Sequence, residues 1–325
     1  MKLPRRKFLQ LSAMAAALPG RSRRAWAQAY PAHQVSILVG FAPGGPTDIA
    51  ARLIGQWLSD RLGQPFIVEN RPGAATNIAT EAVAHAAPDG YTLLAAVSTN
   101  TINPALYTKL SFNFIRDIAM VAGIHRSPLV LEVNPSVPVT SVPELIAYAK
   151  ANAGKISLAS FGSGTVSHVA GELFKAKAGI QMVHVPYRGS APMVTDLLGG
   201  QVNAAMDNLP SSIEYIRAGQ LRALAVTGAA RAPALPHIPA LSELQPGFEA
   251  SAWIGIAAPR ITPIEIIDKL NKEINAGLAD RKIAARIAEL AATVFASSPA
   301  DLDRFVVEQT EQWAKVIRAA KIKLD

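Results

Sequence analysis

Cysteine is absent from this chain of 325 residues, and its absence excludes several kinds of chemistry. Disulfide bonds, thiol catalysis and cysteine-ligated zinc all require a residue that the chain lacks. The six histidines are scattered as single residues, with no pair at the i, i+4 spacing typical of helical zinc sites. We therefore predict neither a metal site nor a cofactor.

Long apolar runs are also missing, although half of the residues are hydrophobic. A helix that spans a bilayer needs roughly 18–20 consecutive apolar residues, and the weakly apolar stretch Phe8–Leu18 is much shorter. We expect a mature protein that is soluble. Its length is sufficient for two domains of ordinary size, each with its own core.

The first 27 residues have the features of an export signal. Arg5 and Arg6, within Pro4-Arg5-Arg6-Lys7-Phe8-Leu9-Gln10, resemble the twin-arginine export motif, and Ala25-Trp26-Ala27 offers a cleavage site. We therefore expect the mature chain to lie in the periplasm. A membrane anchor is the alternative, and the shortness of the apolar stretch argues against it.

The positive charge of the chain belongs to this leader. The whole chain has 32 lysines and arginines against 24 acidic residues, and seven of the basic residues lie in the leader. Without them the balance is 25 against 24, so the mature chain is nearly neutral. A basic surface for nucleic acid is therefore not predicted.

Two segments repeat one design, in which a short apolar strand leads through a glycine-rich turn into a helix. The first runs from the strand Val35–Val39 into the helix Ile49–Leu62, and the second from Ile156–Ala159 into Ser167–Ala178. Glycine lets the backbone approach a ligand closely, and a helix N-terminus presents free N–H groups with a partial positive charge. Such a turn can bind a carboxylate or phosphate without a lysine or arginine. The sequence thus predicts a small-anion site in each half of the protein.

The candidate ligand-binding residues come mainly from these turns. Ser98 and Asp207 join them because each follows a predicted strand, while Asp48 is also explained by a favourable interaction with the helix dipole. The full set is Phe41, Pro43, Gly44, Gly45, Thr47, Asp48, Ser98, Gly162, Ser163, Gly164, Thr165, His168 and Asp207.

Other interpretations of the turns fit less well. A dinucleotide site needs a third glycine, where the second turn has Ser167, and a P-loop needs a Gly-Lys-Ser/Thr sequence that is absent. A hydrolytic triad of Ser163, His168 and Asp207 lacks the G-x-S-x-G sequence around the serine. A strand-to-helix turn that needs glycine only for its geometry remains an alternative for either turn alone.

The order of elements predicts two α/β lobes. Alternating strands and helices fill the region up to about Met120, and the extended segment Leu129–Val133 is expected to cross into a second lobe. Trp253–Ala257 is expected to return to the first lobe, and two helices end the chain. We predict an export signal at 1–27, a first lobe at 28–127 and 227–325, and a second lobe at 128–226. Ligand pockets favour such clefts between lobes.

With these features in place, the mature chain resembles the substrate-binding proteins of tripartite tricarboxylate transporters, the Bug/TctC type. The resemblance rests on an ordered set of motifs at 41–48, 70–74, 87–94, 185–192, 198–202 and 218–227, with Trp253 and Ala258-Pro259. It implies a two-lobed periplasmic-binding-protein fold, the type II flytrap, in which each lobe is a mixed sheet wrapped by helices. The segment Ala74-Ala75-Thr76 departs from the pattern, because the family usually has another glycine there, and Arg126 is unexplained by it.

The resemblance also implies a function. The family closes on small organic acids and delivers them to membrane permease subunits. By resemblance, main-chain groups of 41–48 and 162–165, with His168 beside the latter, hold the ligand carboxylate. We expect a monomeric, non-enzymatic binding protein for a small carboxylate whose identity the sequence does not specify. An exported sensory binding protein and an exported hydrolase are the alternatives.

Overall fold

The computed structural model describes residues 30–324, so the predicted export signal lies outside the described residues. The first elements are β1 (Val35–Val39), α2 (Pro46–Leu62), β2 (Phe66–Asn70), α3 (Asn77–Ala84), β3 (Thr92–Val97), α4 (Ser98–Leu106) and α5 (Phe114–Asp117). They are followed by β4 (Ile118–Val133), α6 (Val142–Ala151), β5 (Ser157–Ser160), α7 (Val166–Ala178), β6 (Val183–Pro186), α8 (Ser190–Leu198), β7 (Ala204–Asn208), α9 (Leu209–Arg217), β8 (Arg222–Val226) and α10 (Leu241–Leu244). The last are β9 (Ser251–Pro259), α11 (Ile264–Ala279), α12 (Arg281–Glu289), β10 (Thr293–Val294) and α13 (Pro299–Ala320).

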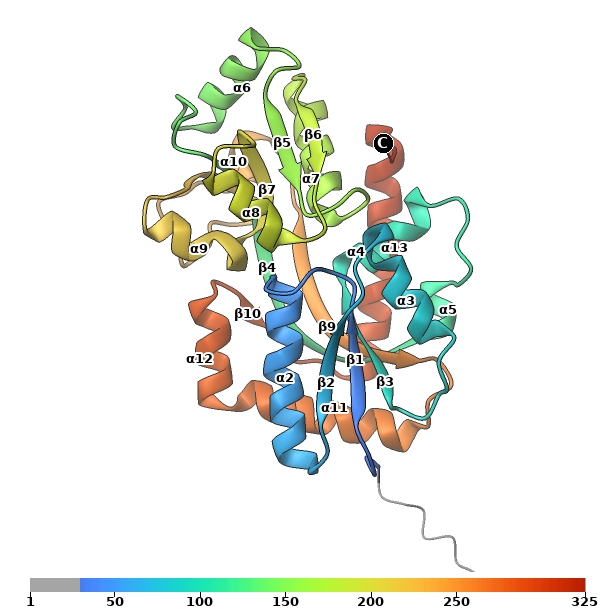
Figure 1. Cartoon of the computed structure of the whole chain (residues 1–325). Helices are drawn as coiled ribbons and strands as arrows, with labels where there is room; N and C mark the ends of the chain where they lie inside the picture. The colour runs from blue at the N-terminus through green and yellow to red at the C-terminus, as the bar shows by residue number, and fades with distance from the viewer. Residues whose placement is uncertain (1–29, 325) are drawn as a thin grey trace, which may run out of the picture.

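The strands form a mixed sheet in the order β2-β1-β3-β9-β4-β7-β5-β6, with β8 and β10 also paired to β4. At one end β1 runs parallel to β2 and β3, and at the other β5 runs parallel to β6 and β7. In the middle, β4 pairs antiparallel with β9 and with β7. Each half of the sheet is therefore mixed and covered by helices (Figure 1), which confirms the predicted fold class.

The long strands β4 and β9 join the two halves (Figure 1). The predicted crossing at Leu129–Val133 is the end of one strand that begins at Ile118. Its earlier part has no clear alternation of apolar and polar residues, and most of its side chains are buried. Gly123 lies within it because a Cβ there would overlap the carbonyl oxygen of Phe295.

Separate apolar cores lie in the two halves. One large cluster is built mainly from buried residues between Leu129 and Ala252, while two others are built mainly from residues of 35–124 and 253–306. The end of α13 extends from the first half into the core of the second, where Trp313 and Ile317 are buried. The predicted lobe bounds place all of α13 in the first lobe, whereas the end of this helix packs into the core of the second half. The bounds themselves remain a prediction.

The C-terminal region differs from the predicted pair of helices, because α11, α12 and α13 make three. Asp280 ends α11 and begins α12, and its side chain accepts hydrogen bonds from the N–H groups of Lys282 and Ile283. An aspartate cap allows one helix to follow another without a glycine or proline between them. The helices α4 and α9 were also not predicted, since each begins directly after a strand with no turn between them.

Candidate functional site

The turn between β1 and α2 has the backbone chemistry of an anion site. Gly44 has a φ of +84°, in the left-handed region that favours glycine. Gly45 is the N-cap of α2, no side chain caps it, and Pro46 opens the helix. The first N–H groups of a helix have no acceptor within the helix, and the N-terminus carries a partial positive charge. The helix begins three residues before the predicted start at Ile49, so Thr47 and Asp48 belong to its first turn.

Asp48 stabilises this turn from within. Its carboxylate accepts hydrogen bonds from the N–H of Gly44 at 3.0 Å, from Nε and Nη2 of Arg52 at 3.0 and 2.9 Å, and from Nδ2 of Asn70 at 2.9 Å. Burial raises the pKa of Asp48, but these hydrogen bonds outweigh burial and lower the pKa overall. Asp48 is therefore a structural anion, and it occupies the N–H of Gly44 that a ligand would otherwise use.

The turn between β5 and α7 is similarly prearranged. Gly162 and Gly164 have φ values of +145° and +79°. The hydroxyl of Thr165 donates to the carbonyl of Gly162 at 2.6 Å, and Thr165 is the N-cap of α7. The N–H of Gly162 donates to Oγ of Ser160 at 3.2 Å. The geometry of this turn is thus set by its own hydrogen bonds.

His168 supports the Gly162–Thr165 turn from the protein interior. It is buried, and its Nδ1 accepts the N–H of Gly164 at 3.1 Å. Its ring stacks on His184, with the ring centroids 4.1 Å apart. His168 therefore positions the Gly162–Thr165 turn rather than lining the space in front of it.

A cavity of about 460 Å³ lies where these segments meet. Among the predicted site residues it is lined by Phe41, Gly162, Ser163 and Thr165. Its other walls come from a second turn of the first half and from aromatic and basic side chains that were not predicted. The remaining lining residues are Gly40, Pro72, Gly73, Ala74, Ala75, Thr76, Ile78, Tyr107, Phe161, Tyr187 and Arg188.

The turn at 72–76 is held in an unusual conformation. Ala74, Ala75 and Thr76 have φ values of +45°, +49° and +71°, a region that L-residues rarely adopt. Two asparagines of α4 hold it, because Nδ2 of Asn103 donates to the carbonyl of Ala75 at 2.8 Å and Nδ2 of Asn100 to Oγ1 of Thr76 at 3.0 Å. Strained backbone persists only where its surroundings fix it, and it clusters at binding sites.

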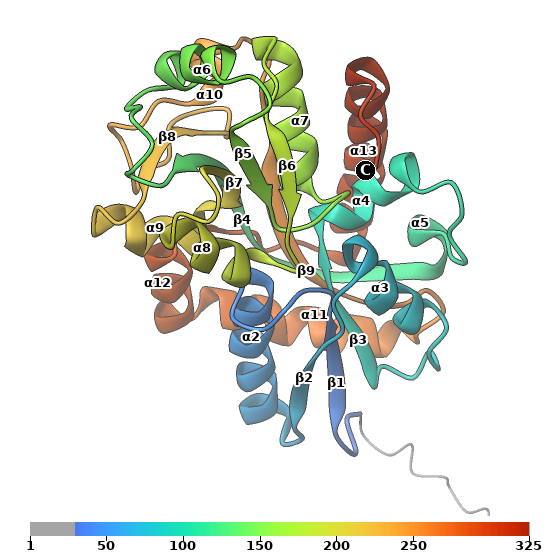
Figure 2. The same ribbon diagram turned by 45° about the horizontal axis from the view of Figure 1, so that its top comes forward.

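A third glycine turn, between β6 and α8, meets the first one. Gly189 has a φ of +138° and is the N-cap of α8, with no side chain capping it. The N–H of Ala42 donates to the carbonyl of Arg188 at 2.9 Å. A Cβ on Gly44 would lie 3.7 Å from that of Ala191, and Figure 2 shows the start of α8 above the start of α2. Two uncapped helix N-termini therefore lie close together.

The sequence contains the signal for this third turn. A strand, a glycine and a helix follow one another at 183–198, as in the two predicted turns. The sequence predicts the strand Met182–Val185 and the helix Ala191–Leu198 here, but not an anion site at the turn between them. Arg188, beside the glycine, is exposed on the cavity wall, and among the described residues no carboxylate forms an ion pair with it.

The remaining predicted residues do not line the cavity. Pro43 and Gly44 are exposed beside it, and Gly164 belongs to the β5–α7 turn. Ser98 is buried at the start of α4, where its carbonyl accepts the hydroxyl of Thr101 at 2.6 Å. The others are buried behind the turns that they support, namely Gly45, Thr47, Asp48, His168 and Asp207.

Asp207 belongs to a buried acidic pair beneath α8. It accepts the hydroxyl of Ser190 at 2.6 Å, and Oγ of Ser212 lies 3.0 Å from Asp207 and 2.7 Å from Glu132. Burial raises the pKa of Asp207 to about 6, and burial and the charge of Asp207 together raise the pKa of Glu132 well above its usual value. One serine proton cannot serve two carboxylates, so we infer that Glu132 is the protonated member. The pair links the hinge strand β4 to the start of α8.

Within residues 30–324, no group of three or more histidine, aspartate and glutamate side chains is placed to hold a metal ion. The same part of the chain contains no helix with the length and apolarity needed to cross a bilayer.

Comparison with known proteins agrees with this architecture. The family model described as "Tripartite tricarboxylate transporter family receptor" matches residues 50–322. Protein BugT of Bordetella pertussis is 38% identical over 301 residues, which cover 92% of each chain.

Solved structures extend the likeness to three dimensions. A Rhodopseudomonas palustris protein titled "R. palustris Rpa4515 with adipate" is 38% identical and has a TM-score of 0.87 over 90% of this chain and 99% of its own. MatC from the same organism, solved with bound malate, is 32% identical and has a TM-score of 0.85 over 89% of this chain and 100% of its own. The periplasmic binding protein BugD is 36% identical, with a TM-score of 0.87 over 90% of this chain and 99% of its own. This chain belongs to the tripartite tricarboxylate transporter receptor family, the Bug/TctC solute-binding proteins.

Proposed function

We propose that the protein is a periplasmic solute-binding protein that captures a small organic carboxylate in the 460 Å³ cavity and delivers it to a tripartite-type membrane transporter. The observation that carries the proposal is that residues of three glycine turns line this cavity, with the N-terminal end of α7 reaching its wall at Thr165. Backbone N–H groups at such ends favour an anion.

The walls of the cavity indicate the class of ligand. Arg188 supplies a positive charge without a protein counter-ion among the described residues, and guanidinium groups match carboxylates in geometry. Phe41, Phe161 and Tyr107 supply apolar surface. A short dicarboxylate fits this combination, with one carboxylate at the turns and the second at Arg188. Adipate and malate, bound by the two R. palustris relatives, belong to that class.

The arrangement offers no support for hydrolysis. In a Ser163–His168–Asp207 triad, Nδ1 of the histidine would face the aspartate. Here Nδ1 accepts the N–H of Gly164, and Asp207 is hydrogen-bonded to Ser190 instead. We therefore propose binding without chemical turnover.

A ligand screen on the mature protein tests the proposal. We expect dicarboxylates such as adipate and malate to raise the melting temperature, because a ligand at 100 times its Kd adds about 2.7 kcal/mol of stability. Calorimetry should then show roughly tenfold weaker binding for Arg188→Met, the loss typical of one charge-assisted hydrogen bond. Arg217→Met is the matched control, because Arg217 already pairs with Glu214 and does not line the cavity. A stabilising ligand without a carboxylate would contradict the proposed ligand class.

Delivery is tested separately by uptake. Cells that lack this chain should lose high-affinity uptake of the labelled ligand and recover it when the chain is restored. Unchanged uptake together with confirmed binding would contradict the transport role and favour sensing.

A further inference from the structure

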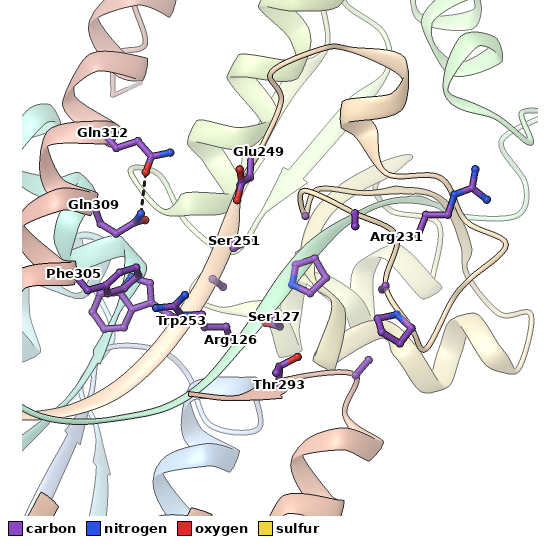
Figure 3. Close-up of a pocket in the computed structure, with 18 of the residues that line it drawn as sticks. Arg126, Ser127, Arg231, Glu249, Ser251, Trp253, Thr293, Phe305, Gln309 and Gln312 are labelled. Carbon is purple, nitrogen blue, oxygen red and sulfur yellow. Dashed lines mark hydrogen bonds between the residues drawn. The ribbon is translucent and has the colours of Figure 1, made fainter. Parts of the chain in front are cut away.

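A second cavity, of about 280 Å³, lies against the two hinge strands (Figure 3). It shares no lining residue with the first cavity. Arg126 on β4 and Trp253 on β9, which are paired across the hinge, form part of its wall. Helix α13 adds Phe305 and Gln309, and Glu249 precedes β9. The cavity therefore contacts both strands that connect the halves of the protein.

Arg126 has a positive charge that no acidic side chain balances. Its Cζ lies 3.5 Å from the ring centroid of Phe295 and 4.3 Å from that of Phe305. Among the described residues no carboxylate forms an ion pair with it, although other arginines of the chain are paired. Partial burial lowers the pKa of Arg126, so the aromatic rings have replaced part of its water. A cation in this state gains from an anionic partner more than a fully hydrated one does.

Two tryptophans form part of the wall of the same cavity. Trp253 and Trp313 are 2% and 4% exposed, and both line it. The Nε1–H of each is buried without an acceptor among the described residues. Both indole nitrogens are buried away from the cavity, so the tryptophans offer it ring surface rather than a hydrogen bond.

We propose that this cavity is an accessory binding site for a small monocarboxylate with a flat or short apolar body. Its carboxylate pairs with Arg126 and its body lies along Pro128 and the neighbouring aromatic side chains. Glu249 lies across the cavity from Arg126 (Figure 3), and its negative charge disfavours a second carboxylate on the ligand. The site therefore differs in preference from the dicarboxylate site, and it does not depend on that site's function.

Benzoate binding to the mature protein tests the proposal, measured by calorimetry with quenching of tryptophan fluorescence as a second readout. We expect saturable binding that becomes roughly tenfold weaker in Arg126→Met, which keeps an apolar contact with the rings and removes the charge. Glu249→Gln should strengthen binding several-fold, because it removes a repulsive charge at an exposed position. Arg188→Met, in the other cavity, should leave benzoate affinity unchanged.

Benzoate affinity should fall in Arg126→Met and rise in Glu249→Gln. A folding defect would lower the affinity in both variants, so the opposite changes identify a specific site. Equal benzoate affinity in wild type and in folded Arg126→Met would overturn the proposal, as would the absence of saturable binding. A loss of affinity in Arg188→Met but not in Arg126→Met would place benzoate in the first cavity and overturn it as well. Failure of dicarboxylates to bind would contradict only the proposed function.

Discussion

At the residue scale, the left-handed backbone of the half-buried Ala75 is a source of strain in the wall of the main cavity. Its φ is +49°, in a region that favours glycine. Ala75→Gly should leave stability unchanged or raise it by up to about 1 kcal/mol, because relief of left-handed strain offsets the entropy of glycine. Ala75→Val should lower stability by about 1–3 kcal/mol, since a β-branched residue fits this conformation poorly. Urea unfolding measures both changes.

The control is an alanine in ordinary helical geometry. Ala82 lies inside α3, so Ala82→Gly should cost about 1 kcal/mol. Equal destabilisation by Ala75→Gly and Ala82→Gly would show that the backbone at Ala75 is unstrained in solution.

Asp207 predicts a pH dependence of stability with a definite sign. Its pKa in the folded protein is about 6, raised from 3.8 by burial. The folded state therefore holds a proton that the unfolded chain has released, and this contribution to stability is lost as pH rises through 6. Between pH 5 and pH 7 the loss should be about 1 kcal/mol.

Denaturant unfolding at pH 5 and pH 7 measures this slope, and Asp207→Asn should flatten it. Asp117 and Glu243, whose pKa values are lowered to about 2, destabilise the protein only at lower pH. Burial lowers the pKa of His125 to about 4, which adds stability as pH rises through this window, and the raised pKa of Glu132 adds a loss, so the contribution of Asp207 is the difference between the slopes of wild type and Asp207→Asn. Equal slopes in the two proteins would contradict the assignment.

At the scale of elements, α2 depends on one side chain at its start. Asp48 holds Gly44, Arg52 and Asn70 together, so it joins the glycine turn, the helix and the end of β2. Asp48→Ala should cost about 2–3 kcal/mol, because several charge-assisted hydrogen bonds are lost at a buried position. Asp48→Asn should cost less, since the amide oxygen can still accept the N–H of Gly44. Thermal unfolding compares the melting temperatures of both variants with that of wild type. Equal melting temperatures in all three proteins would show that the hydrogen bonds of Asp48 do not stabilise α2.

The elements that were predicted best are those with a strong local signal. The strand Val35–Val39 has the bounds that the sequence predicts, because it is a buried apolar run that ends at turn residues. The start of α2 was placed late, since Pro46 was counted with the turn although proline is favourable in the first helical position. The strand β4 was recognised only at its end, because Gly123 and Arg126 obscure its pattern.

The wall of the cavity could be predicted only in part. A glycine turn is visible in sequence, and Phe41 and Ser163 beside such turns do line the cavity. Tyr107 reaches it through long-range packing, which a local pattern does not encode, whereas Arg188 lies beside a strand–glycine–helix signal that the sequence does contain. His168 and Asp207 lie near the turns but are buried, and the sequence does not distinguish a side chain that supports a turn from one that faces a ligand.

At the scale of the whole molecule, the two halves of the sheet are joined by β4 and β9 and touch again across the cavity. This contact is separate from the end of α13, which packs into the core of the second half. It includes the hydrogen bond from the N–H of Ala42 to the carbonyl of Arg188 at 2.9 Å and the edge-to-face pair Phe41–Phe161, with ring centroids 5.8 Å apart. A few weak contacts of this kind are readily opened, whereas the hinge strands are continuous. This arrangement is typical of hinged closure around a ligand.

The structure therefore predicts that ligand and closing contacts act together. Small-angle scattering of the mature protein should give a smaller radius of gyration with a saturating dicarboxylate than without it. Phe41→Ala removes the aromatic contact between the halves, worth about 0.5–1.5 kcal/mol, and should weaken ligand binding by up to roughly tenfold without lowering the affinity to zero. Ile67→Ala is the control. Ile67 is an exposed apolar residue of β2 that does not contact the other half, so its truncation should leave ligand binding unchanged. An identical radius with and without a tightly bound ligand would show that the halves do not move, and an unchanged affinity in Phe41→Ala would show that their contact does not contribute to capture.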